Sequence, residues 1–156
     1  MTKSVKAIPE GYNSVTPYLV VKNANEAIEF YKNAFEAKEI FRMPSKDGKV
    51  KHAEIQIGNS RIMLADECPE MNAFAPKSQS RTPVLIYLYV QDVDHIFTKA
   101  VKAGAKIDRE LTNQYYGDRS GFLTCPFGHS WGVATHVEDV SPEEIAVRAK
   151  AAGQGG

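Results

Sequence analysis

The feature that most constrains the fold of this chain is an internal repeat. The segment LVVKN at 19–23 resembles LYVQD at 88–92 at an offset of 69 residues, and GNS at 58–60 resembles GHS at 128–130 at an offset of 70. Two matched segments with nearly the same offset indicate that both halves of the chain share one structural plan. One half alone has too few strands to enclose a core, so we expect the two halves to pair.

The first half shows the pattern of a β-α-β-β-β unit. A β-type run at 15–21 precedes Asn23, an N-cap residue with an acid three positions later. Apolar residues then recur at helical spacing on one face. Further strands are expected at 38–42, 50–57 and 61–65. The dipeptides Asp-Gly and Gly-Asn mark the turns between these strands, because they supply positive backbone angles.

The second half repeats this pattern. A strand is expected at 84–90, a helix after the N-cap Asp92 that ends at Gly104, and a loop at 115–119. The remaining strands are expected at 106–111, 120–124 and 131–137. We also expect Trp131 in the core, and His129 in a turn where it bonds local backbone.

The length of 156 residues suits one ordinary domain. We therefore predict a single α+β domain over residues 1–156, in which two paired βαβββ modules form curved sheets around a cleft. The predicted parts are a loose arm before module one, module one at about 14–66, a linker at 67–82, module two at about 83–138 and a C-terminal helix at about 141–152. Ser141 starts that helix as a capping box with Pro142 at the first helical position.

Charge and composition limit the partners that we expect. The chain has 19 Lys and Arg against 19 Asp and Glu, so its formal net charge is zero. Because proteins that neutralise several phosphates usually carry a basic excess, nucleic acid is not an expected partner. We find no secretory signal and no run near the ~18 apolar residues of a membrane helix. Two cysteines without a disulfide pattern suit a reducing compartment, so we expect a cytoplasmic protein with no membrane partner.

Five motifs give the chain a family resemblance. They are TPYLVV at 16–21, EAIEFY at 26–31, HAEIQIG at 52–58, YGDRSG at 116–121 and PFGHSW at 126–131. In this order, on a duplicated plan, they resemble the vicinal oxygen chelate superfamily, which includes glyoxalase I, bleomycin-resistance proteins and extradiol dioxygenases, and within it the PhnB-like branch. The resemblance implies paired βαβββ modules with helices on the convex side of the sheets, a ligand on the concave side, and a homodimer.

The alternation of side chains along each strand predicts which residues face the cleft. In residues 84–90 the aliphatic set should lie under the helices, which leaves Tyr87 and Tyr89 in the cleft. In residues 50–57, Ala53, Ile55 and Ile57 should be buried, which leaves His52 and Glu54 for the cleft. The same reasoning selects Tyr18 in the first strand, and the offset of 70 carries His52 onto Phe122.

The loop at 115–119 adds further candidates. Tyr116, Asp118 and Arg119 place a hydroxyl, an acid and a cation beside a glycine that permits close approach. These groups can close over a polar or anionic ligand, or they can brace the loop or a dimer contact. The predicted ligand-binding residues are Tyr18, His52, Glu54, Tyr87, Tyr89, Tyr116, Asp118, Arg119 and Phe122.

The resemblance also predicts where a metal ligand would stand. Metal-using members of the superfamily take a His or a carboxylate from the first and fourth strands of each module. These positions fall on Thr16, Leu85 and Gly132, and on a residue within 61–65, a segment that contains neither His nor acid. None of these residue types is a normal ligand of a divalent metal. We therefore expect the superfamily metal site to be absent, and no cofactor.

Three functions stay open on the sequence. The first is a small-molecule binding protein like the metal-free resistance proteins. The second is a metal-dependent lyase, isomerase or dioxygenase with a relocated site, for which His52, Glu54 and His136 form a possible ligand set. The third is a scaffold whose cleft is filled by its own side chains. No catalytic residue is assigned.

Overall fold

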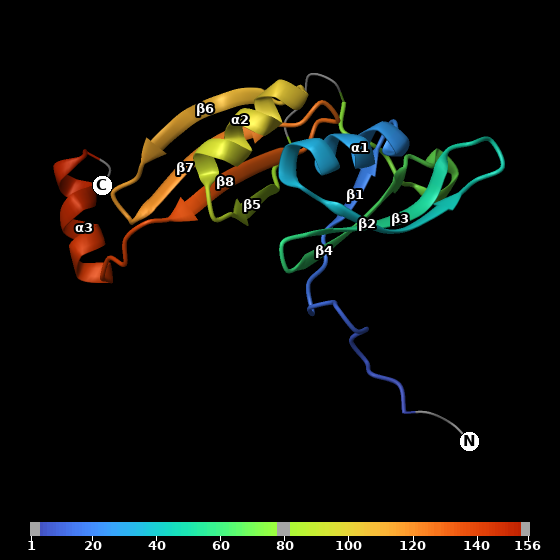
Figure 1. The fold of residues 1–156 in the computed structure, drawn as a ribbon, viewed down its shortest axis with the longest axis horizontal. Helices are drawn as coiled ribbons and strands as arrows, with labels where there is room; N and C mark the ends of the chain where they lie inside the picture. Colours follow the sequence, from blue (N-terminus) through green and yellow to red (C-terminus); the bar gives the residue numbers. More distant parts are fainter. Residues whose placement is uncertain (1–3, 78–81, 154–156) are drawn as a thin grey trace.

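The computed structural model describes residues 4–77 and 82–153 and shows two β-α-β-β-β modules, which confirms the α+β class (Figure 1). Module one consists of β1 (Tyr18–Val21), α1 (Ala24–Phe35), β2 (Lys38–Pro44), β3 (Val50–Ile57) and β4 (Ser60–Asp66). Module two consists of β5 (Leu85–Tyr89), α2 (Val93–Ala103), β6 (Lys106–Asn113), β7 (Asp118–Thr124) and β8 (Ser130–His136). Between the modules lies a short 3-10 helix, η1 (Pro69–Met71), and after them comes α3 (Pro142–Ala151).

The two sheets have the same topology. The strand order is β1-β4-β3-β2 in one sheet and β5-β8-β7-β6 in the other, with β1 parallel to β4 and β5 parallel to β8. Tyr18 pairs with Met63 in module one, and Tyr87 pairs with Gly132 in module two. The repeat seen in the sequence is therefore a repeat of strand pairing.

The predicted helix starts are confirmed. The side chain of Asn23 accepts a hydrogen bond from the backbone of Glu26 at 3.2 Å, and Asp92 caps α2 in the same way. Ser141 caps α3, with Pro142 at its first turn. Each cap satisfies a backbone N–H that the first helical turn leaves without a partner.

Several strand boundaries in the structure differ from the predicted ones. β1 begins at Tyr18 instead of residue 15, because Pro17 has no N–H to donate, although its carbonyl still accepts from Met63. β7 begins at Asp118, so Asp118 and Arg119 are strand residues and not loop residues as expected. The predicted linker contains η1, and its residues 78–81 lie outside the described part of the chain.

Each sheet has one face covered by a helix of its own module (Figure 1). On β3, Ala53, Ile55 and Ile57 are buried while His52 and Glu54 are half-buried, as the alternation predicts. We call the faces that carry His52 in module one and Tyr87 in module two the open faces. No helix of the described residues covers their centres, so the sheets remain open instead of closing into a barrel.

The modules are joined by helix packing and an aromatic cluster. α1 packs against α2, and the rings of Tyr31 and Phe35 lie 5.3 and 4.8 Å from Trp131 of β8. Trp131 is 1% exposed, which confirms its place in the core. His129 differs from expectation, since its Nε2 lies 3.0 Å from the carbonyl oxygen of Val20 in the other module and does not bond local backbone.

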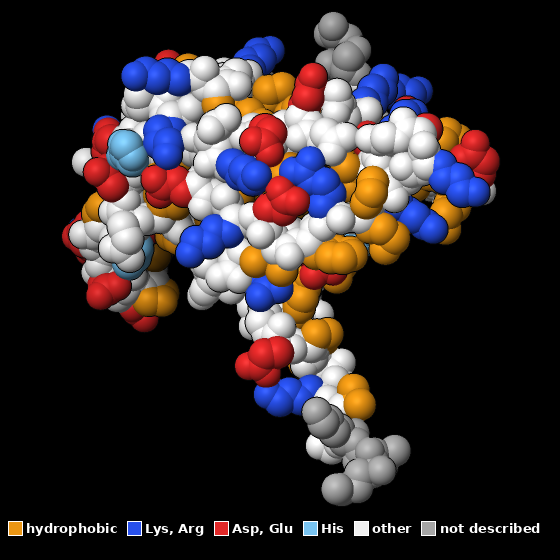
Figure 2. All heavy atoms as spheres, turned by 45° about the vertical axis from the view of Figure 1, so that its right-hand side comes forward, with side chains coloured by type: hydrophobic (Ala, Val, Ile, Leu, Met, Phe, Trp, Pro, Cys, Tyr) orange, Lys and Arg blue, Asp and Glu red, His pale blue; other side chains and the backbone are white. Residues whose placement is uncertain are grey.

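The surface carries charges of both signs. On the face shown in Figure 2, basic and acidic side chains alternate over the body, and no basic stripe follows an element. Within residues 4–77 and 82–153, no helix has both the length and the apolar character that crossing a membrane requires.

Candidate functional site

On the open face of module two, four side chains form a hydrogen-bonded group around a buried carboxylate. Asp118 is 4% exposed, and its Oδ2 accepts from the hydroxyls of Tyr87 at 2.9 Å and Tyr89 at 2.8 Å. Its Oδ1 lies 2.8 Å from Nδ1 of His136. We call Tyr87, Tyr89, Asp118 and His136 the module-two cluster.

His136 links this cluster to the chain beyond the sheet. Its second ring nitrogen, Nε2, lies 2.8 Å from Oδ1 of Asp139. Since an ionised carboxylate can only accept, both ring nitrogens must donate, which makes the ring an imidazolium. The hydrogen bonds to Asp118 and Asp139 accordingly raise the pKa of His136.

The same contacts set the charge of Asp118. Burial opposes ionisation of this carboxyl, but the hydrogen bonds from His136, Tyr89 and Tyr87 outweigh burial and lower its pKa. Burial and the bond to Asp118 raise the pKa of Tyr87 in turn. The module-two cluster is therefore a fixed carboxylate held by two neutral phenols and a cation.

Module one carries a similar group on its own open face. Glu54 accepts from the hydroxyl of Tyr12 through one oxygen, and its other oxygen lies 2.9 Å from Nε2 of His52. Nδ1 of His52 lies 3.1 Å from the hydroxyl of Tyr18. When the ring is neutral, Nε2–H donates to Glu54 and Nδ1 accepts from Tyr18. We call Tyr12, Tyr18, His52 and Glu54 the module-one cluster, and its bonds lower the pKa of Glu54, with Tyr12 the largest cause.

The structure brings most predicted residues together in two sets. Tyr18, His52 and Glu54 meet in the module-one cluster, and Tyr87, Tyr89 and Asp118 meet in the module-two cluster. The ring of Phe122 lies 6.4 Å from that of Tyr87. Tyr116 lies close enough to Tyr87 and Tyr89 to influence their ionisation.

Arg119 is not part of either set. Consecutive strand residues point to opposite faces, so Arg119 lies on the helix-covered side when Asp118 lies on the open face. Its guanidinium donates to Asp94 of α2 at 2.8 and 2.9 Å, and to Asn113. The structure therefore gives Arg119 a bracing contact between β7 and α2.

The correspondence of Phe122 with His52 was wrong by two residues. Phe122 pairs with Gly132, and Glu54 pairs with Met63, so Phe122 takes the place of Glu54 in the repeat. The reason is the turn before the last strand. Module one connects β3 to β4 through Gly58 and Asn59, whereas module two uses residues 125–129 between β7 and β8.

Sequence reasoning missed Tyr12 as a member of the module-one cluster, and it missed Arg109 and Asp139 near the module-two cluster. It placed His136 on the cleft side of the last strand but gave it a role only as a possible metal ligand. The alternation along β8 did give a signal for His136, because it shares a face with Gly132 and Ala134. No comparable signal existed for Tyr12, which lies in irregular backbone before β1.

Strand pairing also identifies the fourth position at which the superfamily resemblance would put a metal ligand. Strand pairing places Met63 at the position that Gly132 occupies in module two, so the four positions are Thr16, Met63, Leu85 and Gly132. None offers an imidazole or a carboxylate. A Cβ atom added at Gly132 would lie 2.8 Å from Cδ2 of Tyr87 and 3.1 Å from Cε1 of Phe122. The residues present do not fit the superfamily metal, and two aromatic rings occupy the space of a side chain at this position.

The relocated ligand set is not assembled within one chain. His52 and Glu54 bond each other in module one, while His136 bonds Asp118 and Asp139 in module two. In the part of the chain that the structure describes, no three His, Cys, Asp or Glu side chains are grouped so that they could hold a metal ion.

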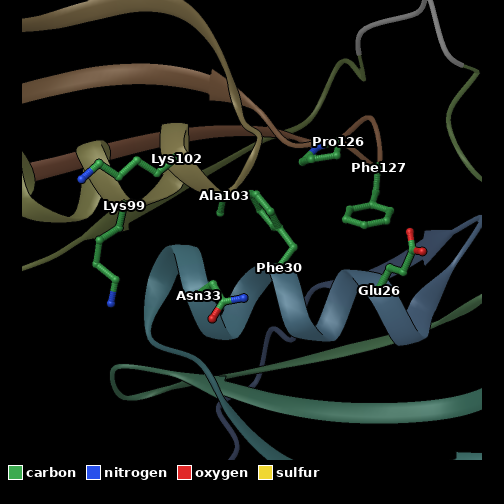
Figure 3. Close-up of a pocket in the computed structure, with 8 residues that line it drawn as sticks. All are labelled: Glu26, Phe30, Asn33, Lys99, Lys102, Ala103, Pro126 and Phe127. Carbon is green, nitrogen blue, oxygen red and sulfur yellow. The ribbon is translucent and has the colours of Figure 1, made fainter.

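Two hollows lie between elements of the two modules. One, of about 920 Å³, lies between the modules and is lined by Tyr87 and Tyr89 together with the β3–β4 turn. The other, of about 590 Å³, lies between α1 and α2 on the helix-covered side, where Phe30 and Phe127 approach each other (Figure 3). Its Lys99 is 3.1 Å from Glu36, and Glu26 lies on its rim. Of these two hollows, the one between the modules reaches the predicted site residues Tyr87 and Tyr89.

Comparison with known proteins agrees with this fold. A sequence model of the Glyoxalase/Bleomycin resistance protein/Dioxygenase superfamily matches residues 11–133. An uncharacterized protein of Mycobacterium bovis is 41% identical over 145 residues, which cover 91% of this chain and 95% of that protein.

Solved structures show the same architecture. A PhnB protein from Bacillus cereus has a TM-score of 0.63 at 19% identity, covering 79% of this chain and 99% of that chain. FosX from Listeria monocytogenes, solved with Mn(II) and dihydroxypropylphosphonic acid, has a TM-score of 0.62 at 20% identity, covering 87% and 96%. These two likenesses concern the fold alone. The matched family model and the Mycobacterium relative show that the chain belongs to the glyoxalase/bleomycin resistance protein/dioxygenase superfamily.

Proposed function

We propose that this protein binds a small organic molecule at the open faces of its sheets and does so without the superfamily metal. The observation that carries the proposal is the module-two cluster. There a buried carboxylate accepts hydrogen bonds from two phenols, and one of these phenols, Tyr87, lies beside the aromatic ring of Phe122. Aromatic surface with a few fixed polar groups is the usual composition of a small-molecule site.

The clusters are suited to binding because they are organised before any ligand arrives. Asp118 holds the hydroxyls of Tyr87 and Tyr89 in place, so their rings lose little freedom when a ligand packs against them. Tyr89 is 59% exposed and Tyr18 is 49% exposed, so both rings present free surface. Aromatic faces then supply contact area, and the polar groups orient the ligand.

The residue types at the metal positions support a metal-free mode. Thr16, Met63, Leu85 and Gly132 leave no superfamily donor set, and the rings over Gly132 take its space. Cys68 and Cys125 are free thiols, which agrees with a reducing compartment, and we extend the proposal to the cytoplasm on that basis.

A thermal-shift screen of metabolites, run with and without EDTA, tests the proposal. A ligand that prefers the native state raises the melting temperature, and we expect the shift to persist in EDTA. Tyr87→Ala and Glu54→Ala should reduce the shift while the protein stays folded. Ile55→Ala is the comparison variant, because Ile55 is fully buried and its loss should cost about 2–5 kcal/mol of stability. A shift that EDTA abolishes, together with a stoichiometric Zn, Ni, Mn or Fe in untagged protein, would establish the metal-dependent alternative instead.

A further inference from the structure

We propose that Arg109 and Phe122 form an anion subsite on the open face of module two, which binds the carboxylate of a planar organic acid. This inference rests on the proposed function and names the class of its ligand. It follows from the placement of the guanidinium, from the hollow around it and from the pairing of the other arginines.

Strand pairing puts the subsite next to the module-two cluster. Arg109 pairs with Phe122 across β6 and β7, and Phe122 pairs with Gly132 on the other side. The guanidinium carbon of Arg109 lies 5.8 Å from the centroid of the Phe122 ring. Because Gly132 has no side chain, the rings of Phe122 and Tyr87 approach each other over it. Arg109, Phe122 and Tyr87 thus form one row on the open face.

The row borders a hollow that is large enough for a small acid. The hollow measures about 520 Å³, and its lining includes Arg109, Asn113, Gln114, Tyr115, Tyr116 and Phe122. The rings of Tyr115 and Tyr116 stand edge to face at 5.2 Å and form a second aromatic wall. Among the described residues that line this hollow, Arg109 carries the only charge.

Arg109 also differs from other arginines of the chain. Arg42, Arg119 and Arg148 each pair with a carboxylate at 2.7 or 2.8 Å. Arg61 donates to Gln56 at 2.7 Å. Arg109 has no ion pair with any residue in 4–77 or 82–153. An aromatic ring supports its guanidinium but leaves the planar N–H groups free, and these match a carboxylate in a two-point contact.

The neighbouring Asp118 does not oppose this ligand. Its carboxylate is 4% exposed, and its oxygens already accept from Tyr87, Tyr89 and His136. The imidazolium of His136 offsets its charge at 2.8 Å. The aromatic walls favour a planar body for the acid, because flat rings stack on or meet the edges of Phe122 and Tyr116.

The test uses 2-naphthoate, 2-naphthamide and inorganic phosphate as probes, with binding measured by calorimetry on the full chain. We expect 2-naphthoate to bind, and the neutral amide to bind at least about tenfold more weakly, which corresponds to about 1.4 kcal/mol. Arg109→Gln should weaken the naphthoate about tenfold, and Arg109→Lys should weaken it less, because it keeps the charge but loses the planar contact. Lys46→Gln, in the β2–β3 turn of module one, removes an equal charge and should change nothing.

The outcomes separate this inference from the proposed function. Equal affinity of wild type and Arg109→Gln for 2-naphthoate would overturn the subsite. If 2-naphthoate and 2-naphthamide bind equally and Phe122→Leu weakens both, the open face binds small molecules but has no anion preference, which overturns the subsite. If neither 2-naphthoate nor 2-naphthamide binds at millimolar concentration, the subsite is overturned. The metabolite screen then decides the proposed function separately. Phosphate that displaces naphthoate at equal concentration would show a general anion site and contradict the preference for a planar acid.

Discussion

At Gly132 the rings of Tyr87 and Phe122 lie directly against the backbone of β8. The nearest ring atom would be only 2.8 Å from an added Cβ, and Tyr87 also holds a hydrogen bond to Asp118 that restricts its movement. A glycine at this position, where the resemblance to the superfamily would put a metal ligand, therefore has a second effect. It makes room for the aromatic surface on which the proposed binding depends.

This crowding predicts the effect of a single methyl group. Gly132→Ala should destabilise the protein by about 1–3 kcal/mol, since overpacking forces rings from their positions. In a Tyr87→Ala background the same change should cost less, because the closest ring is gone. Urea unfolding of the wild type, the two single variants and the double variant forms a double-mutant cycle, which measures the coupling between the two positions. Equal costs in both backgrounds would show that the Tyr87 ring does not limit the site.

At the scale of elements, the alternation along strands predicted most of the open faces. From His52 to Ile57 of β3, half-buried and buried residues alternate, so His52, Glu54 and Ile55 were assigned to the correct faces. Arg109 could not be found in this way. The pairing of β6 with β7 shifts register on both sides of Arg109, between Ile107 and Thr112, and such irregularities interrupt the period of two.

The contacts between the two modules could not be predicted from the sequence either. His129 reaches Val20, and Trp131 reaches Tyr31, across about 100 residues of chain. Strand period and helix caps are local signals, whereas these contacts depend on how α1 and α2 pack. The sequence could predict that Trp131 is buried, but it could not predict which residue would be its partner.

His136 ties β8 to β7 through Asp118 and to the segment before α3 through Asp139, and this predicts a pH dependence. Its two carboxylate partners raise the pKa of His136 in the folded protein. A raised folded pKa means that the stabilisation is fully present below the unfolded value of about 6.5 and is lost as pH rises through the folded value. The stability difference between wild type and His136→Gln should therefore be largest at acidic pH and shrink at alkaline pH.

Urea unfolding at pH 5.5 and pH 8.5 gives this comparison. His95→Gln controls for the loss of a histidine, because the His95 side chain is exposed on α2. At a pH low enough to protonate Asp118, the difference should fall again, since His136 then loses this anionic partner. A difference that grows from pH 5.5 to pH 8.5 would contradict the imidazolium assignment.

At the scale of the molecule, both open faces expose apolar and aromatic side chains. Phe41 and Met43 on β2 are 45% and 39% exposed, and Leu85 on β5 is 43% exposed. β2 is also the edge strand of its sheet, with unpaired backbone groups beside these side chains. Exposed apolar surface of this kind marks an interaction site, and a second copy of the chain provides a face of the same character.

We therefore expect a homodimer in which the open faces are covered by the partner. Sedimentation over a range of concentrations should give twice the mass of one chain, and Phe41→Glu should shift the protein toward monomer, because a carboxylate in an apolar contact loses its hydration. Val147→Glu is the control, since Val147 is 62% exposed on α3, a helix that belongs to neither sheet. A wild type that stays monomeric at all concentrations would contradict the predicted dimer. If both variants dissociate the dimer equally, the dimer contact does not involve the open faces. Because covered faces turn two open surfaces into an enclosed one, Phe41→Glu should also weaken ligand binding in proportion to the monomer formed.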